Sequence, residues 1–103
     1  MVRIIQRFRN VDDTADLSDA ITLNASTSVT IKVANTSRIY FRFDNTSNKN
    51  VWLKLQAASV DDDKKGFFVD KGGYWRMPVD TIYTGEISAI ADVGSPDVFY
   101  TEY

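Results

Sequence analysis

The chain has 103 residues with 12 basic and 14 acidic side chains, and its net charge of −2 provides no general electrostatic drive toward nucleic acid or an anionic membrane. A chain of this length buries roughly two thirds of the surface that its unfolded form exposes, which favours one core and a single domain over residues 1–103. The absence of cysteine and histidine excludes disulfides, the commonest zinc sites, and catalysis by a thiol or an imidazole.

The first residues, MVRIIQRFRN, are basic and contain no long apolar stretch. They predict neither a signal peptide nor a membrane anchor, so we expect folding in the cytoplasm. Apolar side chains within residues 1–9 predict a strand or arm that adds to a neighbouring sheet or completes its own. The interface residues expected here are Val2, Ile4, Ile5 and Phe8.

An acidic segment follows, with Asp12, Asp13, Asp16 and Asp19. The segment is too short and too polar to form a stable helix, so we interpret it as a solvated connection. A short strand, ITL, comes next at residues 21–23.

Three segments show strand periodicity, with apolar and polar side chains alternating: SVTIKV (28–33), RIYFRF (38–43) and VWLKL (51–55). Alternation is typical of antiparallel strands that present one face to a core and the other to solvent or a partner. The segments between them are short and rich in turn-forming residues.

Three N-x-S/T triplets, at Asn24, Asn35 and Asn45, lie in these turns. We interpret them as turn chemistry, because Asn, Ser and Thr side chains hydrogen-bond to nearby backbone in loops. The charged loop DDDKKG (61–66) lacks the ligand pattern of a calcium loop and predicts a solvated loop.

The second half adds strands at 67–69 and 74–77 that flank DKGG, which predicts a tight hairpin. Two more strands are predicted, at YTGEISAIAD (83–92) and DVFYTEY (97–103). In the first of these, Gly85 predicts a close approach, either a β-bulge or a large neighbour such as a tryptophan that rests on the strand. About eight strands with turns between them predict an all-β fold, a single-domain antiparallel β-sandwich that is jelly-roll-like or Ig-like.

Alternation assigns Tyr83, Gly85, Ile87, Ala89 and Ala91 to the core face of residues 83–92, and Thr84, Glu86, Ser88 and Ile90 to a polar face. Because the chain contains no histidine or cysteine, Glu86 has none of the usual catalytic companions. A carboxylate-only hydrolase would pair it with Asp70 or Asp80 at a fixed separation. The sequence predicts no catalytic residue, no cofactor and no metal site.

Several large polar or aromatic side chains fall on the outward faces of predicted strands. Arg38, Tyr40 and Arg42 share one face. Trp52 lies opposite the core positions of its strand, and the facing of Trp75 is ambiguous. We expect these five residues at a protein interface, with the alternative that the tryptophans bind carbohydrate or pack beneath loops.

The order of four segments, 37–55, 66–78, 83–91 and 97–103, resembles small β-sandwich structural proteins of tailed bacteriophages, over residues 36–103. The resemblance implies a non-enzymatic virion protein, a homo-oligomer that decorates or cements the capsid by binding the major capsid protein or other virion proteins. A neck or tail component is the alternative within this class. The matching positions are Asn45, Ser47, 51–53, Gly72, Gly73, Tyr83, Gly85, Ile87, Ala89, Ile90, Val98 and Glu102.

Overall fold

The computed structural model describes residues 15–60 and 64–103, which form nine strands and no helix. Accordingly, no helix within these ranges could cross a membrane. The strands are β1 (Asp16–Leu17), β2 (Ile21–Thr22), β3 (Val29–Lys32), β4 (Phe41–Asp44), β5 (Val51–Lys54), β6 (Phe67–Val69), β7 (Tyr74–Arg76), β8 (Ile87–Ala91) and β9 (Asp97–Glu102).

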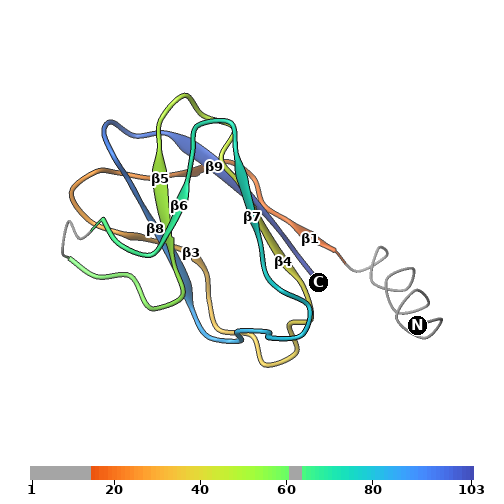
Figure 1. Ribbon diagram of the computed structural model, residues 1–103. Coiled ribbons are helices and arrows are strands. Elements are labelled where there is room, and N and C mark those ends of the chain that lie inside the picture. The colour runs from red at the N-terminus through yellow and green to blue at the C-terminus, as the bar shows by residue number, and fades with distance from the viewer. Residues whose placement is uncertain (1–14, 61–63) are drawn as a thin grey trace.

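Two antiparallel sheets make up a β-sandwich, as the sequence predicted (Figure 1). The first sheet has the order β1-β9-β4-β7, with β2 also paired to β9, and the second has the order β3-β8-β5-β6. Most connections between consecutive strands pass from one sheet to the other, so each sheet is assembled from segments that are distant in sequence. Side chains from both sheets fill the space between them.

The core confirms the predicted alternation in the central strands. Phe41 and Phe43 of β4 and Val51 and Leu53 of β5 are fully buried. Burial of one such side chain is worth about 1.5–3 kcal/mol, so these strands supply much of the hydrophobic stabilisation. The other buried apolar residues are Leu23, Ile31, Val69, Met77, Ile87, Ala89, Ile90, Ala91 and Val98.

Strand β8 departs from the prediction because its outer face is also covered. All of Ile87–Ala91 is buried, including Ser88 and Ile90, which alternation assigned to a polar face. The segment 55–60 is held over the outer face of this sheet by hydrogen bonds between Ser59 and Ser28, at 2.7 and 3.3 Å. We call residues 55–60 the strap.

The stretch before β8 is a loop, whereas the sequence predicted one strand from residue 83. Gly85 does face a large neighbour, and a Cβ at this position would collide with the ring and hydroxyl of Tyr83. The neighbour is therefore a tyrosine two residues earlier, and the expected tryptophan is not involved.

The three Asn triplets form turns as predicted. The side-chain oxygen of Asn24 accepts a hydrogen bond from the Thr27 backbone N–H at 2.8 Å. Asn35 and Asn45 accept equivalent bonds from the residues two positions later, at 3.0 and 3.2 Å. Asn45 is also fully buried, and its amide donates to the carbonyl oxygens of Lys49, Val69 and Asp70. It therefore ties two loops together.

The predicted hairpin at 67–77 is wrong as a strand pairing, although its turn exists. Gly72 has φ +76°, and the Gly73 N–H donates to the Asp70 carbonyl oxygen at 2.8 Å. However, β6 belongs to the second sheet and β7 to the first, so the turn joins the two layers.

Arg38 is also placed differently from the prediction. It precedes β4, is only 3% exposed, and lies in the interior. Its Nε donates to a Glu102 carboxylate oxygen at 2.6 Å, while the two Nη atoms donate to the carbonyl oxygens of Tyr83, Gly85 and Val33 at 2.8–3.0 Å. An interface role for Arg38 is therefore excluded in this fold, because its donors are used inside the domain.

Asp16, which the sequence placed in a solvated connection, instead forms part of β1 and joins the two sheets. The Lys32 ammonium of β3 contacts its carboxylate at 2.5 Å, and the Tyr100 hydroxyl donates to it at 3.0 Å. The hydrogen bonds from Lys32 and then Tyr100 lower the pKa of Asp16. These contacts close one side of the sandwich.

Replacing Arg38 by Ala should lower the free energy of unfolding by about 3–5 kcal/mol, because the buried Glu102 carboxylate would lose its shortest ion pair and keep only the contacts with Asn35 at 3.2 Å and Lys32 at 3.7 Å. Urea denaturation measures this change. The matched control is Arg76→Ala, where the side chain is exposed and the change should stay within about 0.5 kcal/mol. A cost below about 1 kcal/mol for Arg38→Ala would contradict the structural role.

Stability should also depend on pH through Asp16. Because folding lowers its pKa, the contribution is present above the unfolded value of about 3.9 and is lost as pH falls through the folded value. The pair is partly exposed, so the effect is at most about 1 kcal/mol. The difference in thermal midpoint between wild type and Asp16→Asn should therefore hold near neutral pH and vanish in acid. A difference that persists unchanged in acid would argue against a contribution of the ionised Asp16 carboxylate to stability.

Candidate functional site

The structure separates the predicted interface residues. Val2, Ile4, Ile5 and Phe8 lie outside the described residues, and Arg38 is internal. Tyr40, Arg42, Trp52 and Trp75 are partly exposed and lie on or beside β4, β5 and β7. These strands form or adjoin the β6–β7 edge of the sandwich, which therefore contains the candidate site.

Two edge strands meet at this side. β6 is hydrogen-bonded only to β5, and β7 only to β4, so each has one edge that no described strand pairs. The aromatic rings of Phe67 in β6 and Trp75 in β7 lie 4.9 Å apart between their centroids. Their cross-strand partners are the buried Leu53 and Phe43, so both rings point toward the core and close the gap between the sheets.

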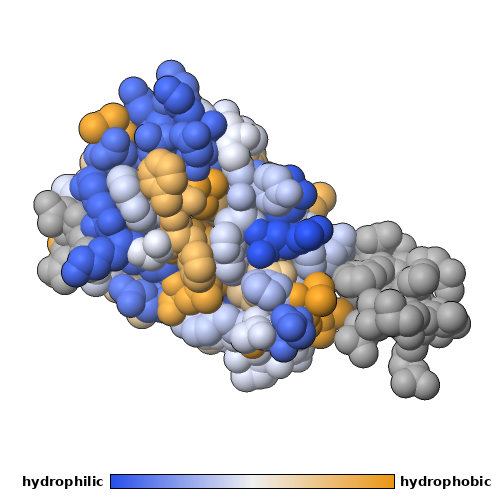
Figure 2. Space-filling model, in the orientation of Figure 1, coloured by the Kyte–Doolittle hydropathy of each residue, from blue (hydrophilic) through white to orange (hydrophobic). Residues whose placement is uncertain are grey.

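A second aromatic pair lies on the outer face of β5 and β6. Trp52 and Phe68 are cross-strand partners whose rings meet edge-on, with centroids 5.3 Å apart. Phe68 is 55% exposed and Phe67 is 44% exposed. Figure 2 shows apolar surface running along β6 in the middle of this view, bordered by more polar surface. We call five side chains along the β6–β7 edge the rim: Trp52 and Phe68 on the outer face of the second sheet, Phe67 and Trp75 between the sheets, and Tyr74 on the outer face of the first sheet.

The outer face of β4 and β7, on the opposite side of the sandwich, carries both charge and aromatic surface. The Arg42 guanidinium lies 4.1 Å from the ring centroid of Tyr74 and forms an ion pair with Asp44 at 3.0 Å. The hydrogen bond to Asp44 raises the pKa of Arg42. Tyr74 remains 57% exposed. Of the three residues that the sequence placed on one face, Arg38 is buried, and Tyr40 and the charge-paired Arg42 remain at the surface.

A hollow of about 450 Å³ lies next to the rim, at the end of β7. Tyr40 lines it, and the rings of Tyr40 and Tyr103 pack against each other with centroids 5.1 Å apart. The remaining lining residues are Arg76, Met77, Pro78 and Val79, and Val79 is 64% exposed. The surface available for contact thus extends beyond the aromatic rings.

Glu86 has a structural environment. Its carboxylate accepts hydrogen bonds from the Thr30 hydroxyl at 2.7 Å and from the Ala58 backbone N–H at 3.2 Å, which anchors the strap. These bonds, Thr30 first, lower the pKa of Glu86, whereas a general acid of a glycosidase needs a raised one. Within the described ranges, no group of three or more potential metal-ligating side chains comes together.

Sequence reasoning missed Phe67 and Phe68 as surface residues. The run FFV indicated a strand, but two apolar neighbours on one strand must point to opposite faces. Only the assembled sheet shows that β6 is an edge, where the inward ring stays accessible from the side. The pattern itself could have indicated that one of the two faces outward.

Comparisons with protein-family models, with curated proteins and with solved structures gave no match to this chain.

Trp75→Ala should reduce the free energy of unfolding by about 2–3 kcal/mol, because its ring closes the core beside Phe67. The loss is smaller than that for a fully buried tryptophan, since the Trp75 ring is half-buried. Tyr74→Ala, the exposed neighbour on the same strand, should cost less than about 1 kcal/mol. Urea denaturation of both variants provides the comparison. Equal losses would show that Trp75 does not close the sandwich.

Proposed function

We propose that the protein is a non-enzymatic structural component of a tailed-phage virion that decorates or cements the capsid by protein–protein contact through the rim. The observation that carries the proposal is the exposure of Phe67, Phe68 and Tyr74 along two strands with unpaired edges. The virion assignment itself rests on the order of strand and turn segments in residues 36–103.

The chemistry of the rim suits a protein partner. Aromatic side chains with few rotatable bonds are enriched at the centres of interfaces, where they provide most of the binding energy. Arg42, the cation that contacts Tyr74 of the rim, is already paired with Asp44, so its desolvation would cost less than that of a lone cation. The edges of β6 and β7 also offer backbone donors and acceptors to a strand of a partner.

A carbohydrate-binding module is the alternative from another class, and the geometry favours it less. Sugar rings stack on open aromatic faces, but Trp52 and Trp75 are half-buried beside phenylalanines. Tyr74 has the Arg42 guanidinium over its ring. A neck or tail location would use the same rim and differs only in the partner.

Co-sedimentation of the purified protein with capsids of the parent phage tests the proposal. Phe68→Ser and Tyr74→Ser should each weaken binding by at least about tenfold, since truncation of an aromatic hot-spot residue costs about 2 kcal/mol or more. Both side chains are exposed, so the variants should fold, and circular dichroism would verify this.

The control is Val93→Ser, which removes an apolar side chain of similar exposure, 52%, from the β8–β9 loop outside the rim. It should leave binding unchanged. Capsid binding that tolerates both rim variants would overturn the role of the rim. Binding to tails alone would move the protein to the neck or tail, and binding to a glycan array without capsid binding would favour the carbohydrate alternative.

A further inference from the structure

A lysine ammonium is buried without a partner on the outer face of the second sheet. Lys54, the last residue of β5, is 4% exposed, and its Nζ has no hydrogen-bond partner among residues 15–60 and 64–103. Its cross-strand neighbour Ser88 is fully buried, and its hydroxyl also has no partner. Burial of an ammonium group costs free energy unless an acceptor compensates it, so this arrangement indicates a missing acceptor.

The local fold explains how Lys54 comes to be buried. Alternation directs it to the outer face with Trp52, where most strands would leave a lysine in solvent. Here the strap begins directly after β5, and residues 64–66 return beside it. At Gly66, φ is +110° and a Cβ would collide with the Leu53 carbonyl. Only glycine allows the returning chain to approach this closely.

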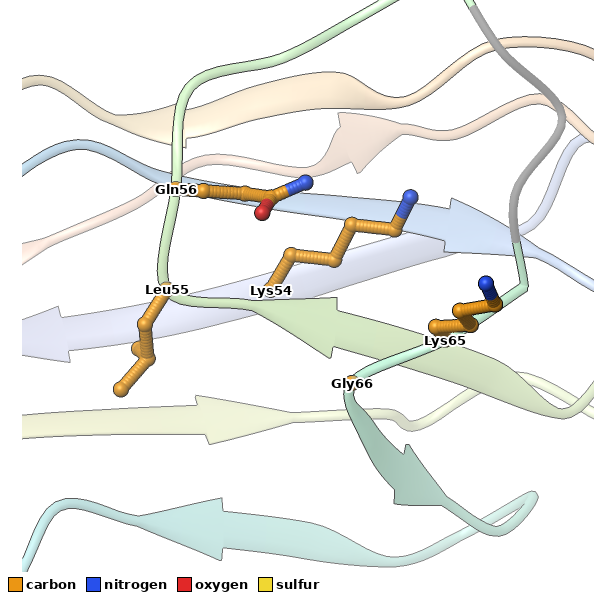
Figure 3. Close-up of a pocket in the computed structure, with 5 residues that line it drawn as sticks. All are labelled: Lys54, Leu55, Gln56, Lys65 and Gly66. Carbon is orange, nitrogen blue, oxygen red and sulfur yellow. The ribbon is translucent and has the colours of Figure 1, made fainter.

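These segments enclose a pocket of about 190 Å³ lined by Lys54, Leu55, Gln56, Lys65 and Gly66. Figure 3 shows the Lys54 side chain extending across the sheet, with its amino group between the Gln56 amide on one side and the Lys65 side chain on the other. Leu55 points away from them. The pocket therefore presents the Gln56 amide beside one buried positive charge, that of Lys54.

We propose that this pocket binds a carboxylate group supplied from outside the chain. A carboxylate accepts hydrogen bonds and carries one negative charge, which matches the single uncompensated Lys54 ammonium. The Gln56 amide at the pocket wall supplies a further donor for the second oxygen. The pocket borders the rim, since Gly66 directly precedes Phe67, but no side chain of the rim lines it. The proposal does not depend on the capsid role.

The chain contains other carboxylates close in sequence, since Asp61, Asp62 and Asp63 directly precede Lys64. The experiment must therefore separate an external carboxylate from one of these three. A variant with all three replaced by asparagine provides that separation.

The test is a titration of the ¹⁵N-labelled full chain with acetate, followed by NMR at constant ionic strength. Wild type should show saturable shifts at the amides of Gln56, Lys65 and Gly66. Lys54→Met should lose them, and Lys54→Gln is the second variant in case methionine disturbs packing. Lys71→Met, which removes an exposed lysine from the turn after β6, should retain them.

Thermal unfolding gives a second readout. The midpoint should rise with acetate in wild type and Lys71→Met, and stay constant in Lys54→Met. Without acetate, Lys54→Met should unfold at a higher temperature than wild type, because the uncompensated charge is gone.

Four outcomes would overturn the proposal. The first is unsaturable shifts equal to those with chloride. The second is saturation with inorganic phosphate but not with acetate. The third is binding only after residues 61–63 are changed to asparagine, which would assign the site to the chain's own carboxylates. The fourth is the absence of any shift in wild type, which would leave a bound water as the acceptor.

Discussion

The buried ion pair between Arg38 and Glu102 is the interaction on which the arrangement of the loops depends. Glu102 is the last residue of β9, and Arg38 precedes β4, the strand that pairs with β9 in the same sheet. The remaining guanidinium donors bind carbonyl oxygens of the loops after β3 and before β8, which belong to the second sheet. One side chain thus fixes both layers at one end of the sandwich, where no ladder connects them. A buried guanidinium is tolerated only when its donors are satisfied in this way.

Two different contacts close the long sides of the sandwich. The β1–β3 side is closed by polar contacts of Lys32 with Asp16 and, at 3.7 Å, with Glu102. The β6–β7 side is closed by the rings of Phe67 and Trp75. Charged side chains that remain hydrated at the edge of a sandwich disfavour association with another protein, whereas partly exposed aromatic rings favour it. One long side of the sandwich is therefore closed by charged groups and the other by aromatic rings.

The sequence predicted the fold class and the central strands, because alternation of apolar residues at 41–43 and 51–53 directly reports burial on one face. It also predicted the turns at Asn24, Asn35 and Asn45, whose chemistry is local. The sequence-based prediction failed where contacts between segments distant in sequence determine the structure. Arg38 was assigned to a strand face because alternation was extended beyond the start of β4 at Phe41. The pairing of β6 with β7 was wrong since a turn signal does not specify which sheet receives each strand.

The same reasoning explains why Lys54 could not be recognised as a candidate site residue. In the sequence it occupies the polar position of an alternating strand, which predicts solvent exposure. Its burial arises from the strap, which is held by Ser28, Thr30 and Glu86, and from the close approach at Gly66. Each of these contacts joins residues distant in sequence. A polypeptide that needed only stability would place an apolar residue beneath such a cover, since an uncompensated ammonium opposes folding. Lys54 is therefore an unfavourable residue for stability alone, and the proposed carboxylate site is the role in which its charge would be used.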